Sequence, residues 1–425
     1  MGGERRLRSQ RAGLAFIFVT LLIDILGWGI IVPVLPHLVQ TLSGGTADQG
    51  AHAFGLLLSA FGLMQFLFAP VLGSLSDRYG RRPVLLLSLL FSTVDYLIQA
   101  TAPSLPWLFV GRVLAGITSA SFTAASAYVA DISPPEKRAQ NFGLIGAAFG
   151  IGFILGPAAG GLLGNLSPRA PFWAAAAISL LNCLYGLFVL PESLAQENRR
   201  RFSWKTANPI SGFGVLARFP IVREMSLAIA LNAVAQQILQ SVWVLYTESR
   251  FAWKPLDNGL SLALVGLGFG VVQAVLTRFA VAGLGERRAV LGGLLLNAAG
   301  LLGYGLATHG WMMYAIIVVW CLGGVAGPTI QGLISREYGP DEQGVVQGAL
   351  TGMQSLIGIV GPVLGTGIFG YFTGAGAPVQ APGAPFFLAA ILGFAATGLA
   401  GKALRRLVPS FRPERSSRVE PGLSV

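Results

Sequence analysis

Residues 53–102 read AFGLLLSAFGLMQFLFAPVLGSLSDRYGRRPVLLLSLLFSTVDYLIQATA, and this stretch decides the class of fold. Two apolar runs, 53–73 and 83–102, flank a short polar loop that holds one acid and three arginines. Each run has about 20 residues, the length that an α-helix needs to cross the hydrocarbon core of a bilayer. The stretch therefore predicts two membrane-spanning helices joined by a tight loop.

The rest of the chain has the same character. Of 425 residues, 53% are hydrophobic and 11% are charged, whereas a soluble domain has about 25% charged residues. A soluble globular protein is therefore excluded. A disordered or nucleic-acid-binding chain is also excluded despite the net charge of +11, because the apolar content is high and aromatic residues do not alternate with basic runs. Twelve spans are expected, at 14–36, 53–73, 83–102, 106–129, 139–164, 171–190, 221–247, 256–279, 288–307, 311–334, 343–372 and 385–404.

These spans predict an all-α membrane protein with twelve transmembrane helices in two pseudo-symmetric bundles of six. The N-terminal bundle is expected in 1–195, and the C-terminal bundle, with a basic cytoplasmic tail, in 221–425. The segment 196–220 is polar and basic, so we expect it to be a cytoplasmic linker between the bundles.

An internal repeat relates the two halves. A shift of 205 positions aligns Gly80 with Gly285, and the Gly-Pro pair at 156–157 with the pair at 361–362. Two parallel repeats predict a pseudo-twofold axis along the membrane normal and a central cavity between the bundles.

Lysine and arginine are concentrated on one side of the predicted spans. They fill both terminal segments, the loop 73–83 and the middle connection, whereas the opposite loops contain only Arg169, Arg250 and Lys254. By the positive-inside rule, both termini and the linker are expected to face the cytoplasm.

Three charged side chains are expected inside the membrane. Asp24 and Asp95 are the only carboxylates well within apolar runs, and Arg112 lies inside the fourth span. Membrane acids are candidates for proton carriage, because a charge there is costly and a proton removes it. A structural ion pair of Asp24 with Arg112 would account for one acid, so we expect a mixed role for the two. Asp131 falls at the end of a span, where we expect it to be solvated.

The second half has no acid in mid-span and offers amides instead. Gln236 and Gln240 are four residues apart and so share one helix face. Some of these amides are expected only to bond neighbouring helices, but a cavity lined by amides and aromatic rings would suit an amphiphilic aromatic substrate. The candidates for the cavity wall are Gln65, Gln236, Gln240, Gln273, Asn297, Trp28 and Trp243.

The fifth span contains the glycine motif GFILGPAAGG at 152–161. Small residues four apart allow helices to pack closely, and a proline inside a helix kinks it. The positions that define the motif are Gly152, Gly156, Pro157, Gly160 and Gly161.

No pattern indicates catalysis or metal binding. His37, His52 and His309 are far apart in the sequence, and no nucleophile and base stand in a recognisable arrangement. Cys183 and Cys321 lie in apolar runs, where we expect them to be small buried hydrophobic residues. The sequence therefore predicts no enzyme, no metal site and no disulfide.

The loop GSLSDRYGRRP, 73–83, resembles the signature loop of the major facilitator superfamily, and the glycine motif resembles that of its drug/proton antiporters. More closely, the chain resembles the tetracycline/proton antiporters, in TLLIDILGWGIIVPVLP and VGRVLAGITSA of the first half and in GERRAVLGG of the other half. The resemblance implies that Asp24 and Asp95 couple transport to protons, with Arg112 as the charge partner in the membrane. It implies that Gln65 matches a polar residue of the second span. The gating loop that it implies comprises Gly73, Asp77, Arg78, Gly80, Arg81 and Arg82.

One departure from these antiporters concerns the ninth span. They are expected to carry an acid there, and this sequence has Asn297. An amide cannot balance the charge of a cationic metal–tetracycline chelate. The departure argues against tetracycline as the preferred substrate and leaves proton-coupled efflux intact.

We therefore expect a monomeric antiporter, driven by the proton gradient without a cofactor, that exports an amphipathic small molecule across a bacterial inner membrane by alternating access. Its expected partners are the small-molecule substrate, protons and the lipid bilayer, with no nucleic acid. Two alternatives stay open. One is a proton-coupled exporter or symporter of a metabolite or siderophore, and the other is a non-transporting membrane receptor or scaffold.

Overall fold

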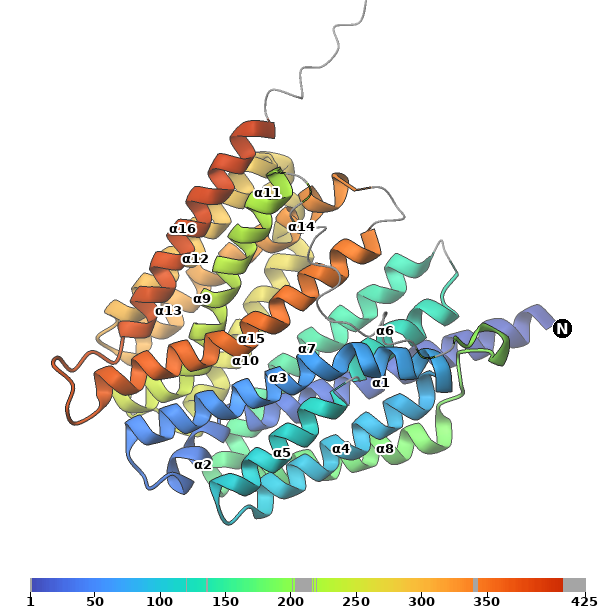
Figure 1. Cartoon of the computed structure of the whole chain (residues 1–425), viewed down its shortest axis with the longest axis horizontal. Helices are drawn as coiled ribbons and strands as arrows, with labels where there is room; N and C mark the ends of the chain where they lie inside the picture. The colour runs from blue at the N-terminus through green and yellow to red at the C-terminus, as the bar shows by residue number, and fades with distance from the viewer. Residues whose placement is uncertain are drawn as a thin grey trace, which may run out of the picture.

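The computed structural model describes residues 2–119, 121–134, 137–200, 202, 216, 218, 220–338 and 343–407 (Figure 1). In these residues the chain forms helices, turns and loops without a strand, so the expected all-α class is confirmed. The helices of the first half are α1 (Gly2–Ile31), α2 (Leu35–Leu42), α3 (Ala47–Tyr79), α4 (Arg81–Thr101), α5 (Leu105–Thr118), α6 (Ser121–Ile132), α7 (Arg138–Leu166) and α8 (Ala170–Val189).

A short 3-10 helix, η2 (Gln196–Asn198), follows the first half. The helices of the second half are α9 (Pro220–Phe251), α10 (Pro255–Val271), η4 (Val272–Leu276), α11 (Thr277–Leu284), α12 (Glu286–Leu306), α13 (Gly310–Leu322), η5 (Gly323–Val325), α14 (Ala326–Arg336), α15 (Gln343–Thr373) and α16 (Ala384–Leu407).

Several expected spans are not single uninterrupted helices. The first, 14–36, was expected to be continuous, but α1 ends at Ile31 and α2 begins at Leu35. Pro33 and Pro36 explain the break, since proline cannot donate a backbone hydrogen bond inside a helix. The fourth span changes from α5 to α6, the eighth contains the π-helical turn η4, and the tenth contains the 3-10 turn η5. Such irregular backbone is tolerated at membrane depth only where protein or a water-filled cavity surrounds it.

Eleven segments of the described residues are long and apolar enough to cross a membrane. One of them, Pro255–Leu306, has 52 residues and so accounts for two of the twelve expected spans. The chain reverses within it at Gly285, which has a φ of 78°. Gly80, at the equivalent position of the first half, has a φ of 109°. Glycine adopts positive φ at little cost, and this explains why both repeats have glycine at this turn.

The helices pack in two groups, which we call the first group (α1–α8) and the second group (α9–α16). Within the first group, α1 packs against α7 and α8, and α4 packs against α5 and α8. Within the second, α9 packs against α15 and α16, and α12 against α13 and α16. The groups meet along two seams, α3 against α15 and α7 against α10. Figure 1 shows that the ends of α11, α14 and α16 lie far from the ends of α1, α3 and α6, so the groups diverge on that side.

The expected domain limits, 1–195 and 221–425, stay a proposal that this packing favours. Most of the expected linker 196–220 lies outside the described residues, as does the basic tail beyond Leu407.

Glycine backbones touch in both seams. In the α3–α15 seam, a Cβ added to Gly62 would lie 3.1 Å from the backbone oxygen of Gly358, and the Ser59 hydroxyl donates a hydrogen bond of 2.5 Å to the backbone oxygen of Ile359. In the α7–α10 seam, a Cβ added to Gly259 would lie against the backbone oxygen of Pro157, and 3.0 Å from the Cα of Gly161. Small residues at these positions allow the backbones to approach closely, as is common between membrane helices.

We expect Gly259→Ala to destabilise the protein, because the added methyl group would collide with the Pro157 carbonyl across the seam. Overpacking of this kind costs about 1–3 kcal/mol. The melting temperature of the purified protein in detergent measures the change. Gly292→Ala on α12 is the control, since its Cβ would meet nothing within 4 Å. That variant should melt at the same or a higher temperature, because alanine is the better helix former. Equal melting temperatures for the two variants would contradict close packing at Gly259.

Candidate transport site

A central cavity of about 840 Å³ lies between the two helix groups. This volume is at the upper end of the range for small-molecule sites, which is about 300–1,000 Å³. The structure places every residue predicted for its wall in the lining, whereas their role in binding stays a prediction. These residues are Gln65, Gln236, Gln240, Gln273, Asn297, Trp28 and Trp243.

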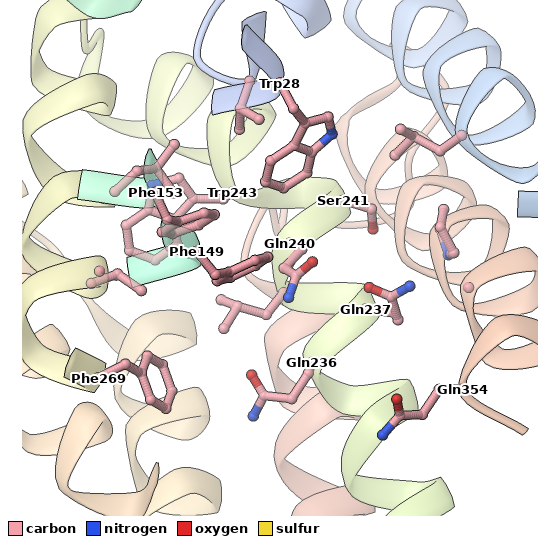
Figure 2. A pocket seen from close by; sticks show the side chains of 18 of the residues that line it. Trp28, Phe149, Phe153, Gln236, Gln237, Gln240, Ser241, Trp243, Phe269 and Gln354 are labelled. Carbon is pink, nitrogen blue, oxygen red and sulfur yellow. The ribbon is translucent and has the colours of Figure 1, made fainter. Parts of the chain in front are cut away.

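Amide side chains form one side of the cavity. Gln236, Gln237 and Gln240 project from successive turns of α9, and Gln354 reaches in from α15 (Figure 2). Gln354 was not among the predicted wall residues. The signal that could have found it is an uncharged polar residue in the middle of an apolar run, the same signal that indicated the amides of α9.

Aromatic rings form another side. Trp28 of α1 and Phe153 of α7 have ring centroids 5.9 Å apart, and Phe149 stacks on Phe153 at 6.0 Å. Trp243 lies deeper in the wall, where its Nε1 donates a hydrogen bond of 3.1 Å to the Ser261 hydroxyl. The cavity therefore offers flat apolar surfaces beside amide groups.

Asn297 is held in an amide pair. The Gln236 Nε2 donates to the Asn297 Oδ1 at 3.0 Å, and the Asn297 Nδ2 donates to the backbone oxygen of Gly293 at 3.1 Å. The pair joins α9 to α12 at the cavity wall, with Asn297 almost completely buried. An amide suits this position because it donates and accepts at once, which a carboxylate cannot do.

Arg112 and Asp95 form a buried ion pair. The Arg112 Nη2 bonds the Asp95 Oδ2, the Arg112 Nε donates to Asp95 Oδ1 at 3.3 Å, and the Gln99 Nε2 donates to Asp95 Oδ2 at 2.9 Å. The expectation that Asp24 is the partner of Arg112 is therefore wrong. The reason lies in the α4–α5 hairpin: Asp95 and Arg112 are almost equally far in sequence from its turn, so the antiparallel helices bring them to a similar depth.

Asp24 has a different environment. Its carboxylate accepts a hydrogen bond of 2.7 Å from the hydroxyl of Ser121, the first residue of α6. Among the described residues it forms no ion pair. Asp24 is half-buried and lies one helical turn before Trp28, which lines the cavity. The two membrane acids are therefore not equivalent.

The loop predicted to gate the transporter is held by charges. The Arg81 guanidinium bonds the Asp77 carboxylate at 2.5 Å and the Asp131 carboxylate at 3.0 Å. Asp131 is therefore paired, which corrects the expectation that it is simply solvated. Glu192, which was not predicted, caps the start of α4 by accepting from the backbone N–H groups of Arg81 and Arg82 at 2.8 and 3.2 Å.

The second group has the equivalent bridge with its charges exchanged. Glu286 and Arg336, whose side chains are 2.7 Å apart, stand 205 positions after Arg81 and Asp131. In each group the bridge joins the start of one helix, α4 or α12, to the end of another, α6 or α14.

The glycine motif of the fifth span packs α7 on two sides. Gly152, Gly156 and Gly160 face α1, where a Cβ on Gly156 would lie 2.8 Å from the Cα of Gly29. Gly161 faces α10, where a Cβ would lie 3.0 Å from the Cα of Leu256. The motif thus belongs to the seam between the groups as well as to the first group itself.

Comparison with known proteins agrees with this architecture. The chain matches the Major Facilitator Superfamily over residues 17–362 and 225–422. It is 42% identical to the class C tetracycline resistance protein of Escherichia coli, over 85% of this chain and 91% of that protein. It is 39% identical to the class G tetracycline resistance protein of Vibrio anguillarum, over 87% and 92%. The human organic anion transporter MFSD10 has a similar structure, with a TM-score of 0.68, 27% identity, and coverage of 92% of this chain and 99% of that one.

The chain therefore belongs to the major facilitator superfamily. It is a multi-pass membrane transporter related to tetracycline resistance proteins, and not an enzyme.

We expect Asp95→Asn to lower the free energy of unfolding by about 3–5 kcal/mol, because it leaves a buried guanidinium without its counter-charge. Adding Arg112→Gln should recover part of this loss, since it removes the unpaired charge. Denaturant or thermal unfolding in detergent measures both variants. A cycle of Asp24→Asn with Arg112→Gln is the control, and it should be additive within about 0.5 kcal/mol. Strong coupling in the Asp24 cycle, with none in the Asp95 cycle, would contradict the assigned pair.

Proposed function

We propose that this transporter is a proton-coupled antiporter that exports an amphipathic small molecule across a bacterial inner membrane. It works as a monomer, without a cofactor, and takes its energy from the proton gradient. The relatives named as tetracycline resistance proteins support drug export. The observation that carries the proposal is the Asp24 carboxylate, which has a single hydrogen-bond partner and no ion pair among the described residues, one turn from the cavity.

The two membrane acids, Asp24 and Asp95, have different roles in this proposal. The negative charge of Asp95 is balanced by the positive charge of Arg112, and the Asp95 Oδ2 also accepts a hydrogen bond from Gln99. The ion pair is therefore neutral without a proton on Asp95. Asp24 has no counter-charge in the described structure and becomes neutral only by taking up a proton. Asp24 therefore carries the exchanged proton, and the pair of Asp95 with Arg112 positions the helices of the first group around the cavity.

Alternating access follows from the two seams. The helix groups are joined along α3–α15 and α7–α10 and diverge at the ends that carry the loop 73–83 (Figure 1). The distribution of basic residues supports a cytoplasmic location for those ends. In this arrangement the cavity opens inward, ready to receive substrate from the cytoplasm. Rocking of one group against the other would open it to the opposite side.

A second candidate is export or symport of a metabolite or siderophore. It is favoured by Asn297, which stands where an acid is expected for a cationic chelate, and by the likeness to a transporter named for organic anions. A non-transporting receptor or scaffold is disfavoured, because Asp24, Asp95 and Arg112 would be costly in the membrane without a transport role.

We expect Asp24→Asn to abolish proton exchange, because an amide cannot bind and release a proton. Proteoliposomes loaded with a pH-sensitive dye measure the proton flux that a panel of aromatic compounds triggers under an imposed pH gradient. The proton flux of Asp24→Asn should be at least about tenfold lower than that of the unmodified protein, and Asp24→Glu should retain part of the flux. Glu197→Gln, an exposed acid on η2, is the control and should behave as the unmodified protein does. Undiminished flux in Asp24→Asn would refute the proton-carrier assignment.

We expect tetracycline resistance from the unmodified protein to be modest and Asn297→Asp to raise it, since a carboxylate would balance the cationic metal chelate. Growth inhibition by tetracycline in a pump-deleted host, at matched expression, measures both. Strong resistance from the unmodified protein, with no gain in the variant, would show that Asn297 does not discriminate between substrates.

A further inference from the structure

Two buried aromatic side chains of the cavity wall carry polar atoms without a partner. They are the indole Nε1 of Trp320 on α13 and the phenol oxygen of Tyr304 on α12, and neither has a hydrogen bond to any described residue. The two rings lie 6.3 Å apart, so both atoms belong to one region of the wall. A buried donor that stays unpaired costs free energy. Such atoms in a cavity wall indicate a ligand, or water, that pairs with them.

The fold satisfies the neighbouring groups of the same kind. The Trp243 Nε1 donates to the Ser261 hydroxyl at 3.1 Å, and the Tyr246 hydroxyl donates to the backbone oxygen of Tyr304 at 2.8 Å. Among the buried Trp and Tyr side chains of this wall, the unpaired atoms are thus the Trp320 Nε1 and the Tyr304 hydroxyl, and the Asn232 Oδ1 of the same lining is also unpaired. Both atoms are buried in this structure, so a change of side-chain rotamer has to accompany their pairing with a ligand in the cavity that the two residues line.

The first helix group adds a further set of donors. Arg112 lines the cavity and is the one charged residue of its described lining, which contains no carboxylate. Its Nε and Nη2 are bonded to Asp95, and a guanidinium has five N–H groups in all, so donors remain. Asp95 itself is only 1% exposed and does not line the cavity. The ion pair thus presents its positive end to the cavity.

From these contacts we propose that the cavity binds an uncharged, polyoxygenated aromatic molecule and discriminates against cations. The oxygen atoms of this molecule accept hydrogen bonds from Trp320, Tyr304 and Arg112, and its rings stack against the aromatic side at Trp28 and Phe149 (Figure 2). This inference rests on the proposed function in one respect only, that the exported molecule binds in this cavity.

Aromatic walls can also attract cations through the faces of their rings. Here the deep rings meet edge to face, so in each pair the edge of one ring covers a face of the other. Trp243 meets Tyr304 at an interplanar angle of 85°, and Phe269 meets Trp320 at 86°. With no acid in the described lining to balance a positive charge, a cation would lose its hydration without compensation.

Two probes of similar aromatic character but different charge test the inference. The first is 1,8-dihydroxyanthraquinone, which is uncharged near neutral pH because phenols keep their proton there. The second is tetraphenylphosphonium, a permanent cation without oxygen. Their affinities for the purified full-length protein in detergent, with no pH gradient, are measured by calorimetry. We expect the anthraquinone to bind at least about tenfold more tightly than the cation.

Two variants localise the binding. Trp320→Phe and Tyr304→Phe each remove one unpaired donor and keep a ring, and each should raise the Kd of the anthraquinone about fivefold or more. Tyr304→Phe should leave the melting temperature unchanged or raise it, because it removes a buried hydroxyl that has no hydrogen-bond partner in the described structure. A weaker Kd without a lower melting temperature would separate a binding role from a structural one. Trp311→Phe is the control on the same helix, since Trp311 is 69% exposed and does not line the cavity, and it should leave the Kd unchanged.

Equal or tighter binding of tetraphenylphosphonium, no binding of the anthraquinone, or an unchanged Kd in both donor variants would overturn the inference. The proposed function is judged separately by proton flux in proteoliposomes. If the anthraquinone binds with the expected pattern but moves no protons, the antiport proposal fails and the ligand class stands. If only cations drive proton flux, the ligand class fails and antiport stands.

Discussion

Close contact between glycine backbones along α3–α15 and α7–α10 is the constraint on which the rest of the structure depends. These seams join the two helix groups at one side of the membrane and leave them apart at the other. The cavity exists because the groups touch along these lines and not over their whole facing surfaces. A side chain at Gly259 would collide with the Pro157 backbone oxygen across the seam. The position of these small residues therefore sets the shape of the cavity as much as the residues that line it.

The sequence was sufficient to predict the membrane helices and much of the cavity wall. Spans could be recognised because lipid demands long apolar runs, and polar residues such as Gln236 and Asn297 stand out inside them. The partner of Arg112 was predicted wrongly, because Asp24 and Asp95 carry the same charge, and charge alone does not tell which helix lies next to that of Arg112. The depth of each residue along its hairpin would have pointed to Asp95. The break in the first span was missed although Pro33 and Pro36 mark it in the sequence. The irregular turns in the fourth, eighth and tenth spans depend instead on tertiary packing that compensates the lost backbone bonds.

The fold pairs some polar groups around the cavity and leaves others unpaired. Arg112 and Gln99 both donate to Asp95, and Gln236 donates to Asn297, and these contacts fix helices relative to each other. Asp24 and the polar atoms of Trp320 and Tyr304 are left with capacity for a proton or a ligand. A transporter has to bind and release its cargo in every cycle, so groups that the fold has already satisfied are of little use for that purpose.

The exchanged bridges, Arg81 with Asp131 and Glu286 with Arg336, bear on how the two halves diverged from a common repeat. A single charge reversal in such a bridge places like charges side by side, so the sign can change only if both residues change. The fold requires two oppositely charged residues at these positions to join the two helices. Which of the two positions carries the acid differs between the halves. A search that relies on the arginine-rich signature of the loop will find the first copy and overlook the second, although the two are built in the same way. The two halves thus keep the contact between equivalent positions, although the residue types at those positions differ.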